Sequence, residues 1–472
     1  MKKIGILLGL MLALAVTVVA ISFDMSKLIG SRQQANDELI ERRFAEHVGV
    51  LAYLYAYPIV DMVQQMHNET HVVGSEQLVF APVNRFYRFP HLVTPEAQGN
   101  FRAPNNDTLY FTAWFDISDQ PVIIHTPDTA GRYFTIAVTN QYAEVEHIGR
   151  RTTGTAERYT ALVLPDFDGE LPNGVQRLEV ETPRGWLLGR MLVDGEADFE
   201  TAFALVEDVW MTELDGFQRS KPSELPVAST AKPMAVLDSP EFFEVFNQQL
   251  QQLPVRPGEA ALLAQFRRLG IGHGLNFEWD KLPNGIQEGL ELALEAGREI
   301  VDASTARTVA SYNGWMVLDN IGRYGYSYLD RASVVAGGYG NLPEESLYPA
   351  KVFDEEGRLL NGKHRYRLHF PAGQLPPVAG FWSLSVYRLK DFSLVSNEIE
   401  RYSIGDRTPG LHYNEDGSLT IWLSHEPPQD ETQAKNWMPA PKEAFSVVVR
   451  LYEPRREVLD YSYRLPPLER VD

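Results

Sequence analysis

The sequence has no cysteine among its 472 residues. This excludes disulfides, thiol nucleophiles, cysteine-ligated metals and a lipidated N-terminal cysteine. A chain of this length can build several hydrophobic cores, so it does not need the crosslinks that stabilise small secreted domains. The absence of cysteine is therefore compatible with export.

Common catalytic signatures are absent as well. There is no G-x-S-x-G elbow, no G-x-x-x-x-G-K-[ST] phosphate loop, no dinucleotide fingerprint after a strand and no H-E-x-x-H motif. His67 and His71 have the spacing that aims two imidazoles at one metal, but Glu69 follows the first histidine by two residues, where a zinc protease has its base at one. We expect surface histidines there, and neither a metal nor a tightly bound cofactor.

Basic residues are scarce relative to acidic ones. The chain has 43 Lys and Arg against 63 Asp and Glu, which gives a net charge of −20. Nucleic-acid binding needs a basic face that neutralises phosphates, so this balance argues against nucleic acid as a partner. It also disfavours docking of the body onto anionic lipid.

The N-terminus has the pattern of an export signal. Two lysines precede the uncharged apolar run Ile4–Phe23, in which Val18 and Ala20 stand where small residues precede a signal-peptidase site. An apolar run of about 20 residues is also long enough to span a bilayer. We predict a periplasmic or secreted protein whose residues 1–23 are either a cleaved signal peptide or an anchor in the inner membrane, the sole membrane contact expected.

The rest of the chain alternates between helical and β patterns. Apolar residues recur every three to four positions from Ser31 to Tyr57 and predict an amphipathic helix that Pro58 ends. Short β-rich runs separated by Asp, Gly, Pro and Asn follow, then helical spacing, then β-rich runs again. We therefore predict a helical segment, a β domain, a helical region and a second β domain, over 24–77, 78–195, 196–312 and 313–472.

One strand of the second β domain shows both of its faces in the sequence. "GFWSLSVYR" places Trp382, Leu384 and Val386 on one face. Ser383, Ser385 and Tyr387 occupy the other face. We expect the first trio to lie in a sandwich core.

The β segments resemble the paired domains called DUF1254 and DUF1214 of exported bacterial proteins. The first pattern appears in "APNNDTLYFTAWFDI", "PVIIHTPDTAGRYFTIAVTNQYAEVEHIGRRTTG" and "YTALVLP". The second appears in "NGWMVLDNIGRYGYSYLDRA", "GFWSLSVYR", "NEIERYSIGDR", "EDGSLTIWLS" and "NWMPAPKEAFSVVVRLYEP". The resemblance implies an α+β, mainly β architecture, with an immunoglobulin-like sandwich, a jelly-roll-like sandwich and a helical portion. It implies no activity, because a fold does not determine a function.

The stretch "APNNDTLYFTAWFD" at 103–116 is the first candidate site. Asparagine and aspartate are common in turns, and a turn is the favoured interpretation of Asn105. Three adjacent polar residues exceed what a turn needs. Asp107 is a candidate general base, Asn106 a candidate for orienting a substrate, and Tyr110 a candidate contact.

The second candidate is "EVEHIGRRTTG". His147 is suited to proton exchange near neutral pH, and Arg150 is suited to gripping an anion through two hydrogen bonds. A charged loop with internal ion pairs is the competing interpretation. If His147 and Asp107 share one end of the sandwich, they form an acid and base pair.

Polar and aromatic residues in the second β domain form the third candidate. Arg401, Asn436 and Trp437 suit a cleft that stacks a sugar ring and hydrogen-bonds its edge, or else they serve inter-domain packing.

Two functional hypotheses follow. The first is a hydrolase-like enzyme that uses acid and base chemistry on a small polar or carbohydrate-like substrate in a cleft between the β domains. The second is a non-catalytic envelope protein that binds a ligand or a protein partner.

Overall fold

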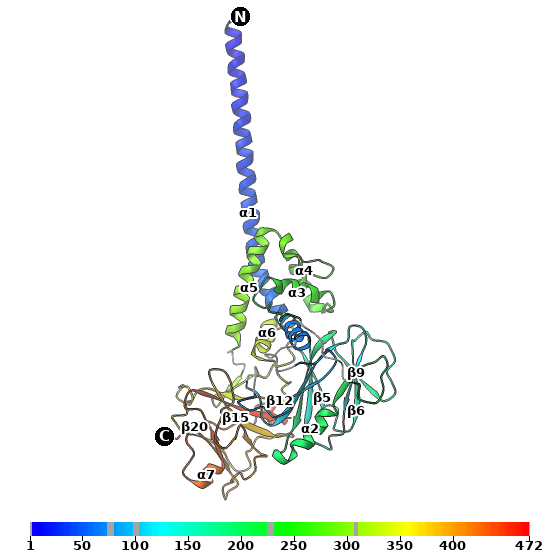
Figure 1. Ribbon diagram of the computed structural model, residues 1–472. Helices are drawn as coiled ribbons and strands as arrows, with labels where there is room; N and C mark the ends of the chain where they lie inside the picture. Colours follow the sequence, from blue (N-terminus) through cyan, green and yellow to red (C-terminus); the bar gives the residue numbers. More distant parts are fainter. Residues whose placement is uncertain (1, 73–79, 98–102, 224–230, 306–309, 472) are drawn as a thin grey trace. The chain divides into compact units, whose positions relative to one another are not determined.

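The computed structural model describes the backbone of residues 2–471 except 73–79, 98–102, 224–230 and 306–309 (Figure 1). Side chains are described in the same residues from Lys27 onward, except at 28 and 310. The predicted signal or anchor, residues 1–23, lies outside the residues with described side chains. In the part that is described, no helix is long and apolar enough to cross a membrane.

The chain forms two compact units. One comprises residues 1–56, 236–251 and 255–300, and the other comprises 57–235, 252–254 and 301–472. Over the described residues, 29% helix and 25% strand in four β-sheets make the class mixed α+β rather than mainly β. Both β regions belong to the second unit.

The helices have the following bounds: α1 Lys2–His71, α2 Phe199–Glu207, α3 Glu241–Leu250, α4 Ala260–Phe266, α5 Asn284–Ser304, α6 Tyr328–Gly337, α7 Glu431–Lys435 and α8 Arg456–Leu459. Helix α3 begins at Glu241, directly after Ser239 and Pro240. The helical turn Arg267–Leu269 that follows α4 ends at Gly270. Its φ of 84° is the left-handed conformation that glycine adopts freely at a helix end.

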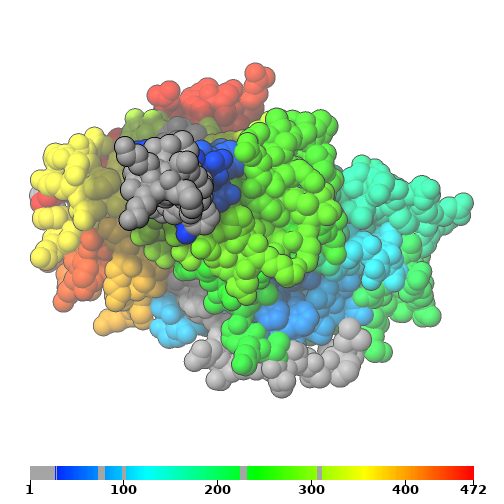
Figure 2. Space-filling model, turned by 90° about the horizontal axis from the view of Figure 1, so that it is seen from above, coloured from blue at the N-terminus to red at the C-terminus, as the bar shows by residue number. Residues whose placement is uncertain are grey.

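In the first unit, α5 lies along α1 (Figures 1 and 2). The two helices approach closely through small residues. A Cβ at Gly289 would overlap the carbonyl oxygen of Arg42 and lie 2.6 Å from the Cβ of Ala45. A Cβ at Gly49 would lie 2.6 Å from that of Ala293. Small side chains on both helices therefore set the spacing of their backbones.

This packing corrects the predicted apolar face of the 31–57 helix. Leu39, Ile40 and Leu51 are exposed, whereas the small Ala45 and Ala52 are buried. The predicted buried face was assigned from the largest apolar side chains in the 3.6-residue pattern. Where α5 comes close at Gly289 and Ala293, the helix buries the small Ala45 and Gly49, and toward Pro58 it buries the large Tyr53, Leu54 and Tyr55.

The predicted helix end at Pro58 is wrong, because α1 continues through Pro58 to His71. A proline inside a helix removes one hydrogen bond and crowds the preceding turn, at a cost of about 3 kcal/mol. Residues Tyr53 and Tyr55 before it and Ile59 and Val60 after it are fully buried. Burial on both sides of Pro58 offsets that cost.

The first sheet pair packs two sheets face to face around a shared core that includes Phe111, Ile136 and Val206 of α2. One sheet has the order β1-β2-β8-β4-β5 and the other β7-β6-β3-β9. The strands are β1 Tyr87–Arg88, β2 Thr108–Asp116, β3 Val122–Thr126, β4 Phe134–Asn140, β5 Val145–Gly149, β6 Arg158–Val163, β7 Val175–Glu179, β8 Arg184–Leu192 and β9 Trp210–Glu213. Because β9 pairs with β3, this sheet pair extends beyond residue 195, the predicted end of the first β domain.

The second sheet pair has the orders β10-β11-β13-β19-β15-β16 and β18-β17-β14-β20. Its strands are β10 Ala310–Tyr312, β11 Trp315–Val317, β12 Ser346–Leu347, β13 Ala350–Lys351, β14 Tyr366–Phe370, β15 Trp382–Arg388, β16 Ile404–Gly405, β17 Leu419–Ser424, β18 Trp437–Pro439, β19 Phe445–Tyr452 and β20 Leu468–Arg470. Trp382, Leu384 and Val386 lie in the shared core, which confirms the predicted face of β15.

Each sheet pair also has a buried outer face. Tyr110 on β2 is aligned with Arg190 on β8. Ser383 on β15 is aligned with Arg450 on β19. Tyr110 and Tyr387 belong to one buried cluster, so the two outer faces pack against each other. Polar side chains are thereby enclosed between the sheet pairs.

We predict that Gly289→Ala destabilises the protein by about 1–3 kcal/mol, because the new methyl group overlaps the backbone of α1. Gly30→Ala is the matched control, since a Cβ there meets nothing within 4 Å and alanine is the better helix former by up to about 1 kcal/mol. Urea unfolding measures both. Equal effects of the two substitutions would contradict the close packing.

Candidate functional site

We call the buried layer between the outer faces of the two sheet pairs the junction. Its polar members are Asp107, Tyr110, Arg190, Asn341, Tyr348, Tyr387, Arg450 and Tyr452.

The segment before β2 is shaped by Asn105. Its side-chain oxygen accepts hydrogen bonds from the backbone N–H groups of Asp107 and Thr108, each at 2.9 Å, which confirms the predicted turn. Its amide donates to the hydroxyl of Tyr110 at 2.6 Å. The neighbouring Asn106 donates to the Val93 carbonyl at 2.6 Å. The turn thus leaves Asp107 at the start of β2, directed at the second sheet pair.

Asp107 connects the two sheet pairs. Its carboxylate accepts hydrogen bonds from Ser383 at 2.6 Å and Ser403 at 3.0 Å, and it pairs with Arg407 at 3.4 Å. The residue is 7% exposed. Three donors therefore converge on its two oxygens.

Two arginines lie in the junction without a carboxylate of their own. Arg190 donates to Asn341 at 2.9 Å and lies over the ring of Tyr110. Arg450 donates to the Ala103 carbonyl and to the Tyr387 hydroxyl, each at 2.6 Å. In the described part of the chain, neither guanidinium forms an ion pair with a carboxylate.

Several polar atoms in this layer are buried without a hydrogen-bond partner among the described residues, and Nη1 of Arg450 and the hydroxyl of Tyr452 are two of them. Arg450 is 3% exposed and Tyr452 is 1% exposed. Burial raises the pKa of the Tyr452 hydroxyl well above its usual value, so the hydroxyl keeps its proton. Both groups are therefore donors that face no protein acceptor.

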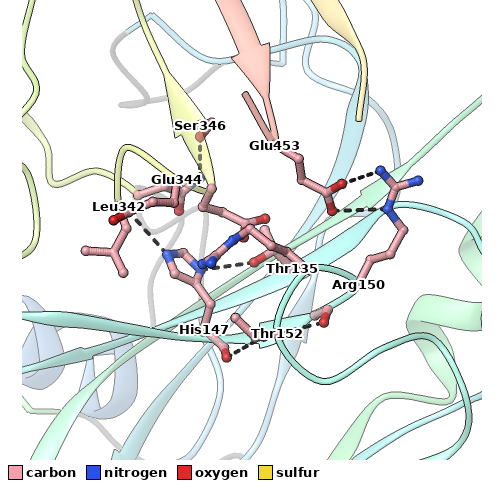
Figure 3. Close-up of polar contacts among 12 residues, drawn as sticks. Thr135, His147, Arg150, Thr152, Leu342, Glu344, Ser346 and Glu453 are labelled. Atoms are coloured by element: carbon pink, nitrogen blue, oxygen red, sulfur yellow. Dashed lines mark hydrogen bonds and ion pairs between the residues drawn. The ribbon is translucent and has the colours of Figure 1, made fainter. Parts of the chain in front are cut away.

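His147 is fixed on both sides of its ring (Figure 3). The backbone N–H of Leu342 donates to Nε2 at 3.3 Å, so we infer that Nδ1 carries the proton and donates to Thr135 at 3.0 Å. Burial holds the pKa of His147 well below its usual value, and the charges of Arg151 and Arg190 lower it further. The ring is neutral at physiological pH.

The arginines after β5 bind carboxylates of the second sheet pair. Arg150 contacts both oxygens of Glu453 (Figure 3), and Arg151 donates to Glu345 at 2.8 Å. Tyr133 donates to the other oxygen of Glu345 at 2.9 Å. The anion that Arg150 grips is therefore part of the same chain.

The structure does not bring Asp107 and His147 together. They lie on β2 and β5, which are three strand spacings apart in the order β2-β8-β4-β5, and the register offsets them by five residues along the strands. With about 4.8 Å between strands and about 3.3 Å per residue, their Cα atoms are roughly 20 Å apart. A shared acid and base pair is not formed.

The residues of the third candidate site, Arg401, Asn436 and Trp437, make their contacts within the second sheet pair. Arg401 donates to the Trp437 carbonyl at 2.7 Å, and Asn436 bonds both the N–H and the C=O of His412. Trp437 lines a cavity of about 580 Å³ with His425. The cavity has no lining residue in common with the junction.

Family models identify both β regions. The protein-family descriptions DUF1254 and DUF1214, each a protein of unknown function, match residues 83–213 and 345–456. The chain belongs to the DUF1254 and DUF1214 family. Asp107, Arg190 and His147 lie in the DUF1254 domain, and Ser383, Arg450 and Tyr452 lie in the DUF1214 domain, so the junction lies between the two named domains.

A solved structure shares this fold. The VPA0106 protein from Vibrio parahaemolyticus is 21% identical with a TM-score of 0.68, over 91% of this chain and all of that chain. An uncharacterised protein from Burkholderia cenocepacia is 13% identical with a TM-score of 0.42, over 93% and 96% of the two chains. No curated protein matches the chain.

Sequence reasoning missed Arg190 and Arg450. Each is a single charged residue inside an apolar strand, in "WLLGRMLV" and "FSVVVRLYEP". That pattern was a usable signal, because an arginine is almost never fully buried unless a partner holds it.

The end of α1 carries a second pair of polar residues that the sequence analysis did not single out. Asp61 accepts a hydrogen bond from Tyr339 at 2.8 Å, and Glu69 accepts one from Trp114 at 2.7 Å. Burial raises the pKa of Asp61 to about 6 and that of Glu69 to about 7. The nearby His67 and His71 rings stack at 5.4 Å, and no group of three possible ligands for a metal occurs among the described residues.

The raised pKa of Asp61 predicts a dependence of stability on pH. Well below pH 3.8, its ordinary pKa, the carboxyl is protonated in folded and unfolded chains alike. As the pH rises to about 6 the unfolded chain releases the proton first, so folding stability falls. Asp61→Asn keeps an acceptor for Tyr339 and cannot ionise, and we expect it to raise the melting temperature much more at pH 8 than at pH 4.

Asp119→Asn is the control for this prediction, because Asp119 is an exposed residue of the same charge. Its effect on the melting temperature should be the same at both pH values. An Asp61→Asn effect that does not change with pH would contradict the buried, protonated carboxyl.

Arg407 allows a matched test of Asp107. Asp107→Ala should cost about 3–5 kcal/mol, because it leaves Arg407 and two serines without their acceptor in a buried layer. Asp194→Ala removes the other carboxylate of Arg407, at 3.5 Å and 65% exposed, and should cost less than about 1 kcal/mol. Unfolding in guanidinium chloride compares the two variants. A similar loss in free energy of unfolding for both would show that Asp107 does not hold the sheet pairs together.

Proposed function

We propose that this chain is an exported protein that binds a small polar ligand at the junction and does not transform it. The observation that carries the proposal is the pair of buried donors, Arg450 Nη1 and the Tyr452 hydroxyl, which have no acceptor among the described residues. A buried donor without an acceptor costs about 1–3 kcal/mol. A bound molecule with acceptor oxygens would recover that free energy.

The state of the two predicted catalytic residues favours binding over catalysis. Asp107 already accepts hydrogen bonds from Ser383, Ser403 and Arg407. His147 has both ring nitrogens engaged and a pKa far below neutral. A general base needs a free lone pair within reach of the substrate. Both side chains already have hydrogen-bond partners in the protein, and the two residues lie too far apart to act on one substrate.

We also propose the finer architecture for this function, an immunoglobulin-like sandwich in the DUF1254 domain and a jelly-roll-like sandwich in the DUF1214 domain. Two stiff sandwiches that meet at their outer faces provide rigid walls, and rigid walls lower the entropy cost of holding a ligand.

The cavity at Trp437 supports a second candidate, acid and base chemistry on a carbohydrate-like substrate. His425 lines this cavity, and its Nδ1 lies 3.0 Å from the Ala440 carbonyl. That bond directs the proton to Nδ1 and leaves a lone pair on Nε2. Trp437 in the same wall would stack a sugar ring.

A screen of small molecules by thermal shift tests the leading proposal. The protein is mixed with a library of neutral, cationic and anionic metabolites, and a specific ligand should raise its melting temperature. The effect should be weakened in Asp107→Asn, at the junction, and unchanged in Trp437→Ala, in the separate cavity.

Mass spectrometry of each hit after long incubation separates the two candidates. Binding without chemistry predicts that the ligand is recovered unchanged. A converted ligand, with turnover lost in His425→Ala, would replace the leading proposal by the second. The absence of any hit that depends on a junction residue would overturn the leading proposal.

A further inference from the structure

We propose that the ligand at the junction carries an oxyanion, a carboxylate or a phosphate, that Arg190 and Arg450 recognise. This inference rests on the proposed ligand-binding function and names the chemical class that the site selects. The observation behind it is the balance of charge and of hydrogen-bond donors in the junction.

The charges in the junction are not balanced by its own residues. Arg190 and Arg450 are 9% and 3% exposed, and the carboxylate whose charge acts on Arg450 is that of Asp107. That carboxylate is already paired with a third arginine, Arg407. Burying a charge without a counter-charge is costly. The junction lacks this counter-charge although the chain as a whole is acidic, with a net charge of −20. An anion supplied from outside would provide the missing counter-charge.

The neighbouring arginines show the contrasting case. Arg150 and Arg151 enter the same layer and each has a glutamate from the second sheet pair, Glu453 and Glu345. The fold therefore provides carboxylates for arginines that serve structure. It provides none, within the described residues, for Arg190 and Arg450.

The donors lie close to one another. Arg450 and Tyr452 are two residues apart on β19, so their side chains leave the same face of the strand. The charges of Arg190 and Arg450 both act on the hydroxyls of Tyr452 and Tyr110. The set thus combines two guanidinium groups with phenolic donors, which match the several lone pairs of an oxyanion.

Tyr452→Phe tests this assignment without disturbing the fold. The hydroxyl has no partner in the described structure, so its removal should leave the melting temperature of the protein unchanged or slightly higher in chloride buffer. The probes are inorganic phosphate, acetate and succinate, each compared with sodium chloride at the same ionic strength.

At least one of these probes should raise the melting temperature of the wild-type protein by a few degrees near saturation. Tyr452→Phe should weaken its binding about tenfold or more, measured by calorimetric titration. Phosphate and carboxylate probes distinguish the two sources of the oxyanion. Tyr413→Phe is the control, because Tyr413 is 41% exposed and lies outside the junction.

Two results would overturn the inference. One is that none of the oxyanions stabilises the protein. The other is a shift of equal size in wild type and Tyr452→Phe, which would mark a general salt effect on folding. If a neutral or cationic metabolite nevertheless stabilises the protein and depends on Asp107, the proposed binding function stands and the oxyanion assignment falls. If no molecule of any class does so, both fall.

Discussion

The carboxylate of Asp107 is the interaction on which the described arrangement of the two β regions depends. It lies at the start of β2 in one sheet pair and accepts hydrogen bonds from Ser383 and Ser403 of the other. Arg407 adds an ion pair to the same group. Because Asp107 is largely removed from water, its loss would leave the groups that bind it without their acceptor, at a cost in stability.

Around this contact, the junction separates polar groups that serve the fold from groups that do not. His147, Arg150 and Arg151 are held by Leu342, Glu453 and Glu345. Arg450 and Tyr452 lie on β19, just before Glu453, and keep donors without acceptors. Unsatisfied buried polar groups are uncommon in folded proteins, and each needs an explanation. This difference, rather than the mere presence of titratable residues, is the basis of the proposed binding region.

Much of the fold could be predicted from the sequence, since strand alternation and helix caps act locally. The core face of β15 and the turn at Asn105 are examples. The end of α1 could not be predicted, because burial on both sides of Pro58 outweighs a local preference. The distance between Asp107 and His147 depends on strand order, which inserts β8 and β4 between them. Periodicity within one strand contains no information on which strand lies next to it.

A crystal structure grown with phosphate or succinate, at a resolution that shows ordered solvent, tests the central claim most directly. The account predicts density for an oxyanion within hydrogen-bond distance of Arg450 Nη1 and the Tyr452 hydroxyl, with Asp107 still bonded to Ser383 and Ser403. A closed junction in which both donors reach protein acceptors, and no anion is present, would contradict it.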